Sequence, residues 1–224
     1  MDGIPGLGPL LLTLKLAVVT TAILIVICTP AAWWLANTKN KIKPIIEAVV
    51  ALPIVLPPTV IGFYLLIFLG PEGWLGSLWL KVSGETITFS FFGLVIASII
   101  YSLPFVMQPL QSAFESIGNE VMEAAATLGA KPLDAFISIA LPLSKRGFLT
   151  ATVMGIAHTL GEFGVVLMVG GNIPGETRVI SIAIYDHVET LNYSTAHSMS
   201  LALLILAFSA MLSLYFINRK RDMG

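Results

Sequence analysis

Residues 123–142 read EAAATLGAKPLDAFISIALP, and this stretch separates two apolar segments that are long enough to cross a membrane. Its local chemistry predicts two short helices joined by a turn. Asn119 is placed to cap the first helix, because its side chain can accept a backbone N–H that the first turn leaves unpaired. Gly129 is placed to end that helix in a left-handed conformation.

The second short helix is expected to begin at Pro132, whose φ is preset for the first turn of a helix. We expect it to run to about Ser138. Leu141-Pro142 then breaks the helix before the chain enters the next apolar segment. The stretch therefore predicts a helix–turn–helix that lies outside the hydrocarbon layer.

The composition of the whole chain is that of a membrane protein. Hydrophobic residues make up 56% of the 224 residues and charged residues only 11%, and the mean hydropathy is +0.90. A soluble domain usually carries about 25% charged residues, so this chain lacks the polar surface that a water-soluble globule needs. The net charge of −1 gives no indication of a nucleic-acid partner.

Five apolar stretches are long enough to span the bilayer, which takes about 20 helical residues. We therefore expect an all-α integral membrane protein with five transmembrane helices and a cytoplasmic helix–turn–helix at about 115–146. The expected spans are about 10–36, 44–69, 89–113, 148–170 and 196–217.

Positive charges set the expected orientation, because cytoplasmic loops of membrane proteins are enriched in Lys and Arg. With five spans, the N-terminus lies outside and the C-terminus in the cytoplasm. A sixth span within 171–195 would place the basic tail outside, so we expect at most a short surface or re-entrant helix at 179–184. The basic residues that this topology gathers on one side are Lys39, Lys41, Lys43, Lys131, Lys145, Arg146, Arg219, Lys220 and Arg221.

The second expected span contains three prolines, Pro53, Pro57 and Pro58, followed by Thr59. Each proline removes a backbone hydrogen bond and bends a helix, and freed carbonyls are tolerated in a membrane only against protein or a water-filled path. These four residues therefore either line a path through the membrane or its gate, or form a static kink that serves packing.

The fourth expected span carries His158 and Glu162, which lie one helical turn apart on one face. Charged side chains within a membrane usually face a partner or a water-filled cavity. The pair either holds the helices of a pathway in register or forms a local hydrogen bond without a role in transport. No HExxH or GxSxG motif accompanies it, so an intramembrane enzyme is a weak alternative.

Binding motifs for cofactors are absent from the sequence. The glycine-rich stretch 170–178 is not followed by the Gly-Lys-Ser/Thr of a phosphate-binding loop. His187 and His197 are isolated, and we expect neither to bind a metal. Cys28 is the only cysteine, so an internal disulfide is excluded.

The helix–turn–helix also resembles the EAA loop of ABC importer permeases. In that family the loop docks into a cleft of the ATP-hydrolysing subunit. Without the resemblance, the stretch would be read as a capped amphipathic connector between two spans. The matching positions are Glu123, Ala124, Ala125, Gly129, Ile139, Leu141 and Pro142.

Within that family the chain looks like the molybdate permeases, and the resemblance covers nearly all of its length. It rests on the stretches LPPTVIG at 56–62, LGEFG at 160–164 and NIPGETR at 172–178. Permeases for sulfate and tungstate share part of this pattern and remain alternatives. His158 is a departure, because many relatives carry an arginine there.

The resemblance implies the type I ABC importer permease fold, with one transmembrane domain over residues 1–224. It also implies a homodimer of permeases, two ATP-binding subunits that hold ATP and Mg, and an external oxyanion-binding protein. The chain itself would bind no cofactor and no metal, and would not hydrolyse ATP. A secondary carrier that works without ATP would usually show an internal repeat, and none is evident.

Overall fold

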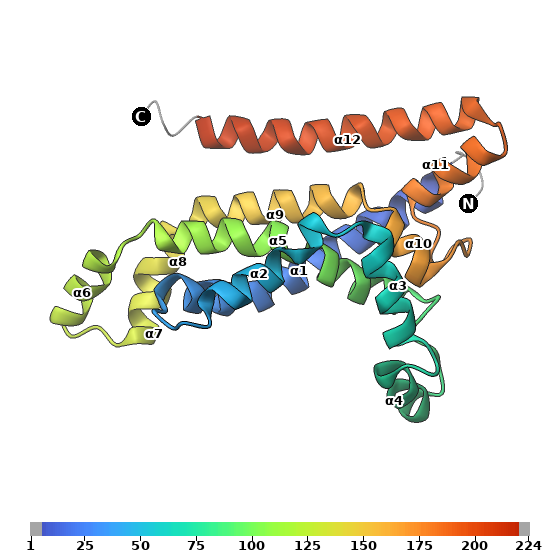
Figure 1. Cartoon of the computed structure of the whole chain (residues 1–224). Coiled ribbons are helices and arrows are strands. Elements are labelled where there is room, and N and C mark those ends of the chain that lie inside the picture. Colours follow the sequence, from blue (N-terminus) through green and yellow to red (C-terminus); the bar gives the residue numbers. More distant parts are fainter. Residues whose placement is uncertain (1–5, 220–224) are drawn as a thin grey trace.

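The computed structural model describes residues 6–219, and every regular element in this part of the chain is a helix (Figure 1). The elements are α1 Leu7–Asn37, α2 Lys43–Val55, α3 Pro58–Leu69, α4 Trp74–Ser83, α5 Phe91–Glu115, α6 Asn119–Thr127, α7 Pro132–Ala135, a π-helical turn Phe136–Ala140, α8 Leu141–Leu143, α9 Lys145–Leu160, α10 Gly164–Gly170, α11 Ile180–Glu189 and α12 Tyr193–Arg219.

Three of these helices, α1, α5 and α12, are each long and apolar enough to cross a membrane. Two further stretches meet the same test only as bent pairs. The axes of α2 and α3 differ by 110°, and those of α9 and α10 by 63°. The described chain thus has three to five candidate spans, and they coincide with the five apolar stretches of the sequence.

The break between α2 and α3 comes from two successive prolines. A proline disfavours the helical conformation of the residue before it. Leu56, which precedes Pro57, has φ −75° and ψ 137°, and Pro57, which precedes Pro58, has φ −55° and ψ 137°. Two extended residues in a row redirect the chain. Pro53 lies inside α2 without breaking it, so only two of the three prolines make the break.

The break between α9 and α10 has no proline. Helix α9 ends at Leu160, and Phe163, with φ −132° and ψ −64°, precedes α10. Close packing holds the two broken segments together: a Cβ on Gly62 of α3 would lie 2.8 Å from the Cβ of Met168 in α10. A Cβ on Gly164 would lie 2.9 Å from the Cβ of Pro58. Small residues allow such close approach of membrane helices.

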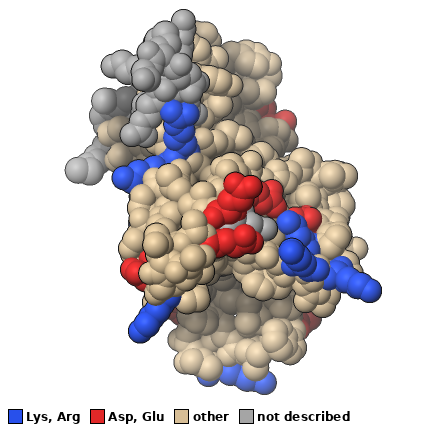
Figure 2. All heavy atoms as spheres, turned by 90° about the vertical axis from the view of Figure 1, so that its left-hand side faces the viewer, with Lys and Arg blue, Asp and Glu red and all other residues tan. Residues whose placement is uncertain are grey.

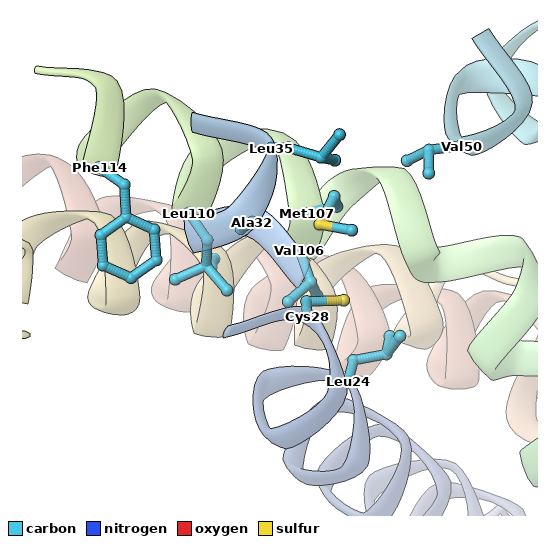
Figure 3. Close-up of a cluster of buried hydrophobic side chains, with 10 residues drawn as sticks. Leu24, Cys28, Ala32, Leu35, Val50, Val106, Met107, Leu110 and Phe114 are labelled. Carbon is cyan, nitrogen blue, oxygen red and sulfur yellow. The ribbon is translucent and has the colours of Figure 1, made fainter. Parts of the chain in front are cut away.

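Helices α1, α5 and α9 form the centre of the molecule, and a buried apolar cluster fills the space between them (Figure 3). Small residues bring the three backbones together. A Cβ on Gly155 of α9 would lie 2.8 Å from Val106 of α5 and 3.1 Å from Thr21 of α1. The cluster comprises Leu24, Cys28, Ala32, Leu35, Val50, Val106, Met107, Leu110, Phe114 and Ala151.

Outside this centre, the segment between the second and third expected spans is not a simple loop. It contains the ten-residue helix α4, bounded by Gly73 and by Gly84 with φ +76°. The predicted short helix after residue 179 is present as α11. Helix α12 is largely exposed and lies along α9 and α11 (Figure 1). The tail residues Lys220 and Arg221 lie outside the described residues.

Candidate functional site

Helices α6 to α8 project from one end of the bundle, at the left of Figure 1, and contain the motif on which the sequence prediction rested. Helix α6 begins at Asn119, so Gly118, and not Asn119 as predicted, holds the N-cap position. Gly118 has φ +74°, a conformation that favours glycine. Glu120 lies in the first turn, where the helix dipole favours a negative charge.

The predicted end of α6 at Gly129 agrees with the structure. Gly129 has φ +85°. Its N–H donates to the carbonyl of Ala126 at 2.9 Å, and the N–H of Ala130 donates to the carbonyl of Ala125 at 3.0 Å. This pair of hydrogen bonds is the Schellman motif, which satisfies carbonyls at the end of a helix.

The second short helix begins at Pro132 as predicted but does not end near Ser138. It continues to Leu143 through the π-helical turn Phe136–Ala140. The N–H of Leu141 donates to the carbonyl of Phe136, five residues back. This wider turn accommodates Pro142, which has no N–H and whose ring would clash with a carbonyl in a regular α-helix. The prediction that Leu141-Pro142 breaks the helix was therefore wrong.

The motif residues differ in exposure. Ala125 is buried, and Ile139 and Leu141 are half-buried. The exposed motif residues are Glu123, Ala124, Gly129 and Pro142. Leu128 and Leu133, which the sequence reasoning missed, are 89% and 69% exposed at the tip of the loop. Seen end-on, acidic side chains gather near the middle of this face and basic ones around them (Figure 2). The loop thus presents apolar side chains next to charged ones.

The broken helices enclose a second candidate site, a cavity of about 550 Å³. Four of the predicted path residues line it: Pro58, Thr59, His158 and Glu162. Pro53 is buried within α2 and Pro57 is exposed, and neither is among the residues that line the cavity. The other lining residues are Tyr101, Ala157, Gly161, Phe163, Gly164, Leu167 and Met168.

Glu162 lies in the break itself and is 3% exposed. The hydroxyl of Ser98 in α5 donates to its Oε2 at 2.6 Å, while Oε1 has no hydrogen-bond partner among the described residues. The hydroxyl of Ser181 in α11 donates to the backbone carbonyl of Glu162 at 2.6 Å. The break is therefore attached to two neighbouring helices.

His158 makes its contacts with α5 and not with Glu162, because α9 ends between the two residues. Its Nδ1 pairs with the hydroxyl of Ser102 at 2.8 Å, and the ring of Phe105 stacks on it at 3.8 Å between centroids. Tyr101 packs on the same ring at 4.8 Å. The suggestion of a local His–Glu hydrogen bond is thus wrong.

The α5 side of this network was missed from the sequence, although a signal was present. Ser98, Tyr101, Ser102 and Phe105 recur at intervals of three and four residues, which places them on one face of a helix. Polar groups at that spacing in an otherwise apolar span would have indicated a face directed at the His158–Glu162 segment.

Comparison with known proteins identifies the family of the chain. The family model described as "Binding-protein-dependent transport system inner membrane component" matches residues 28–223. The chain belongs to this family. The resemblance of the chain to ABC importer permeases is thereby confirmed, and the match supports an inner-membrane, multi-pass component of a transport system.

Individual relatives in this family are similar to this chain over almost its full length. The molybdenum transport system permease protein ModB of Azotobacter vinelandii is 52% identical, and the match covers 95% of this chain and 94% of the relative. A probable sulfate transport system permease protein of Zygnema circumcarinatum is 34% identical, and the match covers 94% of this chain and 72% of the relative.

A solved structure shares the fold. A bacterial alginate ABC transporter, crystallised with a periplasmic protein bound to an alginate pentasaccharide, contains a chain that superposes with a TM-score of 0.78. The match covers 98% of this chain and 80% of the other, at 18% identity. The two chains therefore share the helical arrangement although their sequences differ widely.

Proposed function

We propose that this chain is the permease subunit of an ATP-driven importer that carries molybdate across the cytoplasmic membrane. The observation that carries the proposal is the 52% identity, over 95% of the chain, to a molybdenum transport permease. The sulfate relative is more distant at 34% identity. Molybdate and sulfate are both tetrahedral dianions, and tungstate shares their shape, so competition among them is part of the test.

Five spans are the topology that fits this function: α1, the bent pair α2–α3, α5, the bent pair α9–α10, and α12. Helix α1 then begins outside, and helices α6 to α8 face the cytoplasm. The basic residues Lys39 and Lys41 lie between α1 and α2, and Lys43 begins α2, at the end that also carries α6. Their position supports this orientation, because positive charge is enriched in cytoplasmic loops.

Energy for transport enters at the tip of the cytoplasmic loop. The sequence contains no Walker motif, so ATP and Mg bind to separate ATPase subunits. The exposed side chains of Glu123, Leu128 and Leu133 dock into such a subunit, and the Schellman turn at Gly129 keeps α6 at a set angle to α7. We propose a homodimer of permeases, two ATPase subunits and an external oxyanion-binding protein as the complete importer.

Motion of the loop reaches the cavity through α9, because α8 leads directly into α9 and α9 ends at the break beside Glu162. Rocking of packed helices against one another is a common route to alternating access. Thr59, Tyr101 and His158 line the cavity and supply hydrogen-bond donors to an oxyanion that passes the break. The cavity needs few fixed positive charges to bind the oxyanion, because transport requires weak binding from which the ion is released quickly.

The test is reconstitution of the permease with its ATPase in liposomes that enclose ATP, with the binding protein added outside. We expect ATP-dependent uptake of labelled molybdate that tungstate inhibits more strongly than sulfate. Glu123→Lys is expected to abolish stimulation of ATP hydrolysis by the binding protein. Uptake by the permease alone, without the ATPase, would refute the proposal.

The position of the path is tested separately by cysteine accessibility. Thr59→Cys is expected to react with a water-soluble thiol reagent in at least one nucleotide state, because Thr59 is exposed in the cavity wall. Absence of labelling in every state, while transport is retained, would exclude this cavity as the path.

A further inference from the structure

A second cavity, of about 510 Å³, lies between α5 and α9 at the end of the bundle that carries helices α6 to α8. Its chemistry differs from that of the first. The polar side chains that line it are Ser112, Ser116, Ser144, Arg146 and Thr150. No carboxylate is among the described residues that line it. A wall of hydroxyl groups with one guanidinium suits an anion.

Ser144 points most directly to a ligand. It is 2% exposed, and its Oγ has no hydrogen-bond partner among the described residues. Ser144 holds the N-cap position of α9, where a serine side chain usually caps a backbone N–H, yet here it forms no capping bond. A buried hydroxyl without a partner costs free energy, and a bound oxyanion would accept from it.

The first turn of the sixteen-residue helix α9 begins at Lys145, beside Ser144. Backbone N–H groups of a first turn lack intrahelical partners and form a favourable site for an anion. Gly147 brings this turn close to α5, because a Cβ there would overlap the Cβ of Ala113. The helix terminus and the hydroxyls of α5 thus face the same cavity.

The neighbouring cavity on α5 has the opposite character, which strengthens the assignment. It shares Ser112 but contains Glu47 and Glu115, whose carboxylates accept hydrogen bonds from Gln111 at 2.6 and 3.0 Å. The inner end of α5 therefore separates an acidic side from a side with hydroxyls and a positive charge.

The second cavity lies on the same side of the α5–α9 pair as the first. Ser112 and Ser116 follow Tyr101 by 11 and 15 residues, close to three and four helical turns. On α9, Thr150 and Arg146 precede Ala157 by 7 and 11 residues, close to two and three turns. Eleven helical residues correspond to about 16 Å along the axis.

We propose that the cavity at Ser144 is a binding site for a tetrahedral oxyanion, on the cytoplasmic side of the helix breaks. The occupant is either the transported oxyanion, held once more before release, or the phosphate of an anionic lipid headgroup. Only the first source rests on the proposed function; the site itself follows from its hydroxyls, its helix terminus and its positive side chain.

The test measures protection of an introduced cysteine in the assembled permease–ATPase complex. Cys28 is buried, so Ser116→Cys at the rim of the cavity is the cysteine of the permease that N-ethylmaleimide reaches, and its alkylation is read on the permease chain alone. Molybdate or inorganic phosphate, in nanodiscs of phosphatidylcholine, is expected to slow alkylation at least threefold. Adding Ser144→Ala with Thr150→Val is expected to raise the half-protecting concentration about tenfold. Ser77→Cys in α4 is the matched control and gains no protection.

The lipid arm repeats the measurement in nanodiscs of phosphatidylglycerol without added oxyanion. Protection there, lost with the same double substitution, assigns the site to a headgroup phosphate. Thr150→Cys is the second reporter in case Ser116→Cys does not fold. Unchanged alkylation with molybdate, phosphate and anionic lipid overturns the proposal. If molybdate uptake by the same complex is normal, the proposed function survives that result.

Discussion

Substitution of Gly129 isolates one energetic quantity, the cost of a left-handed backbone in the turn between α6 and α7. A Cβ at Gly129 would meet no heavy atom within 4 Å, so no steric clash with a neighbour contributes. The free-energy cost of the substitution therefore comes from the φ of +85° alone. An L-residue in the left-handed region costs about 1–2 kcal/mol, which changes a local equilibrium about 5–30-fold.

The assay is amide hydrogen exchange at Ala130, whose N–H closes the Schellman turn onto Ala125. In Gly129→Ala we expect the protection factor of this amide to fall by about 5–30-fold, and stimulation of ATP hydrolysis by the binding protein to fall with it. In Gly129→Asn the protection factor and the stimulation are expected to fall less, because asparagine tolerates the left-handed region. In Gly129→Val both should fall most.

The control for this series is Gly8→Ala in α1. A Cβ there also meets nothing within 4 Å, and the φ of Gly8 is not in the left-handed region. Exchange at Ala130 and stimulation of the ATPase should be unchanged. Wild-type exchange and stimulation in Gly129→Ala would refute the idea that the turn sets the angle of α6.

Three further predictions concern packing and the buried polar network. Gly147→Ala is expected to destabilise the permease by about 1–3 kcal/mol in thermal unfolding, because overpacking forces α9 away from α5, and Ala113→Gly in the same chain should restore part of the loss. Ser98→Ala leaves both carboxyl oxygens of Glu162 without a described partner. We expect the free energy of unfolding to fall by about 1–3 kcal/mol. An unchanged melting temperature would show that this hydrogen bond does not attach α5 to the break. Cys28 should resist maleimide in the folded complex and react fully in denaturant, because its side chain is buried.

The apolar pattern of the sequence predicts much of the fold. The expected stretches at 10–36, 89–113 and 196–217 became α1, α5 and α12 with ends shifted by a few residues. This works because a membrane span must satisfy every backbone polar group within its own helix. The end of α6 was equally readable, because only glycine adopts a φ of +85° without strain.

Other features needed the folded chain. The prolines at 53, 57 and 58 all looked like helix breakers, yet the break occurs where Pro57 and Pro58 follow one another, and Pro53 fits within α2. The π-helical turn before Pro142 was not foreseen, since its wider hydrogen bonding is a local adjustment with no separate sequence signal.

The sequence by itself determined that the chain spans a membrane, where α6 ends, and that His158 and Glu162 lie in an apolar stretch. These follow from hydrophobicity and backbone preference, which act within a few turns of one helix. Only the tertiary structure decided that Ser98 donates a hydrogen bond to Glu162 and that His158 pairs with Ser102. It also decided that the buried hydroxyl of Ser144 has no partner among the described residues. Each of these depends on which face one helix presents to another, and that is settled by close packing between segments distant along the chain.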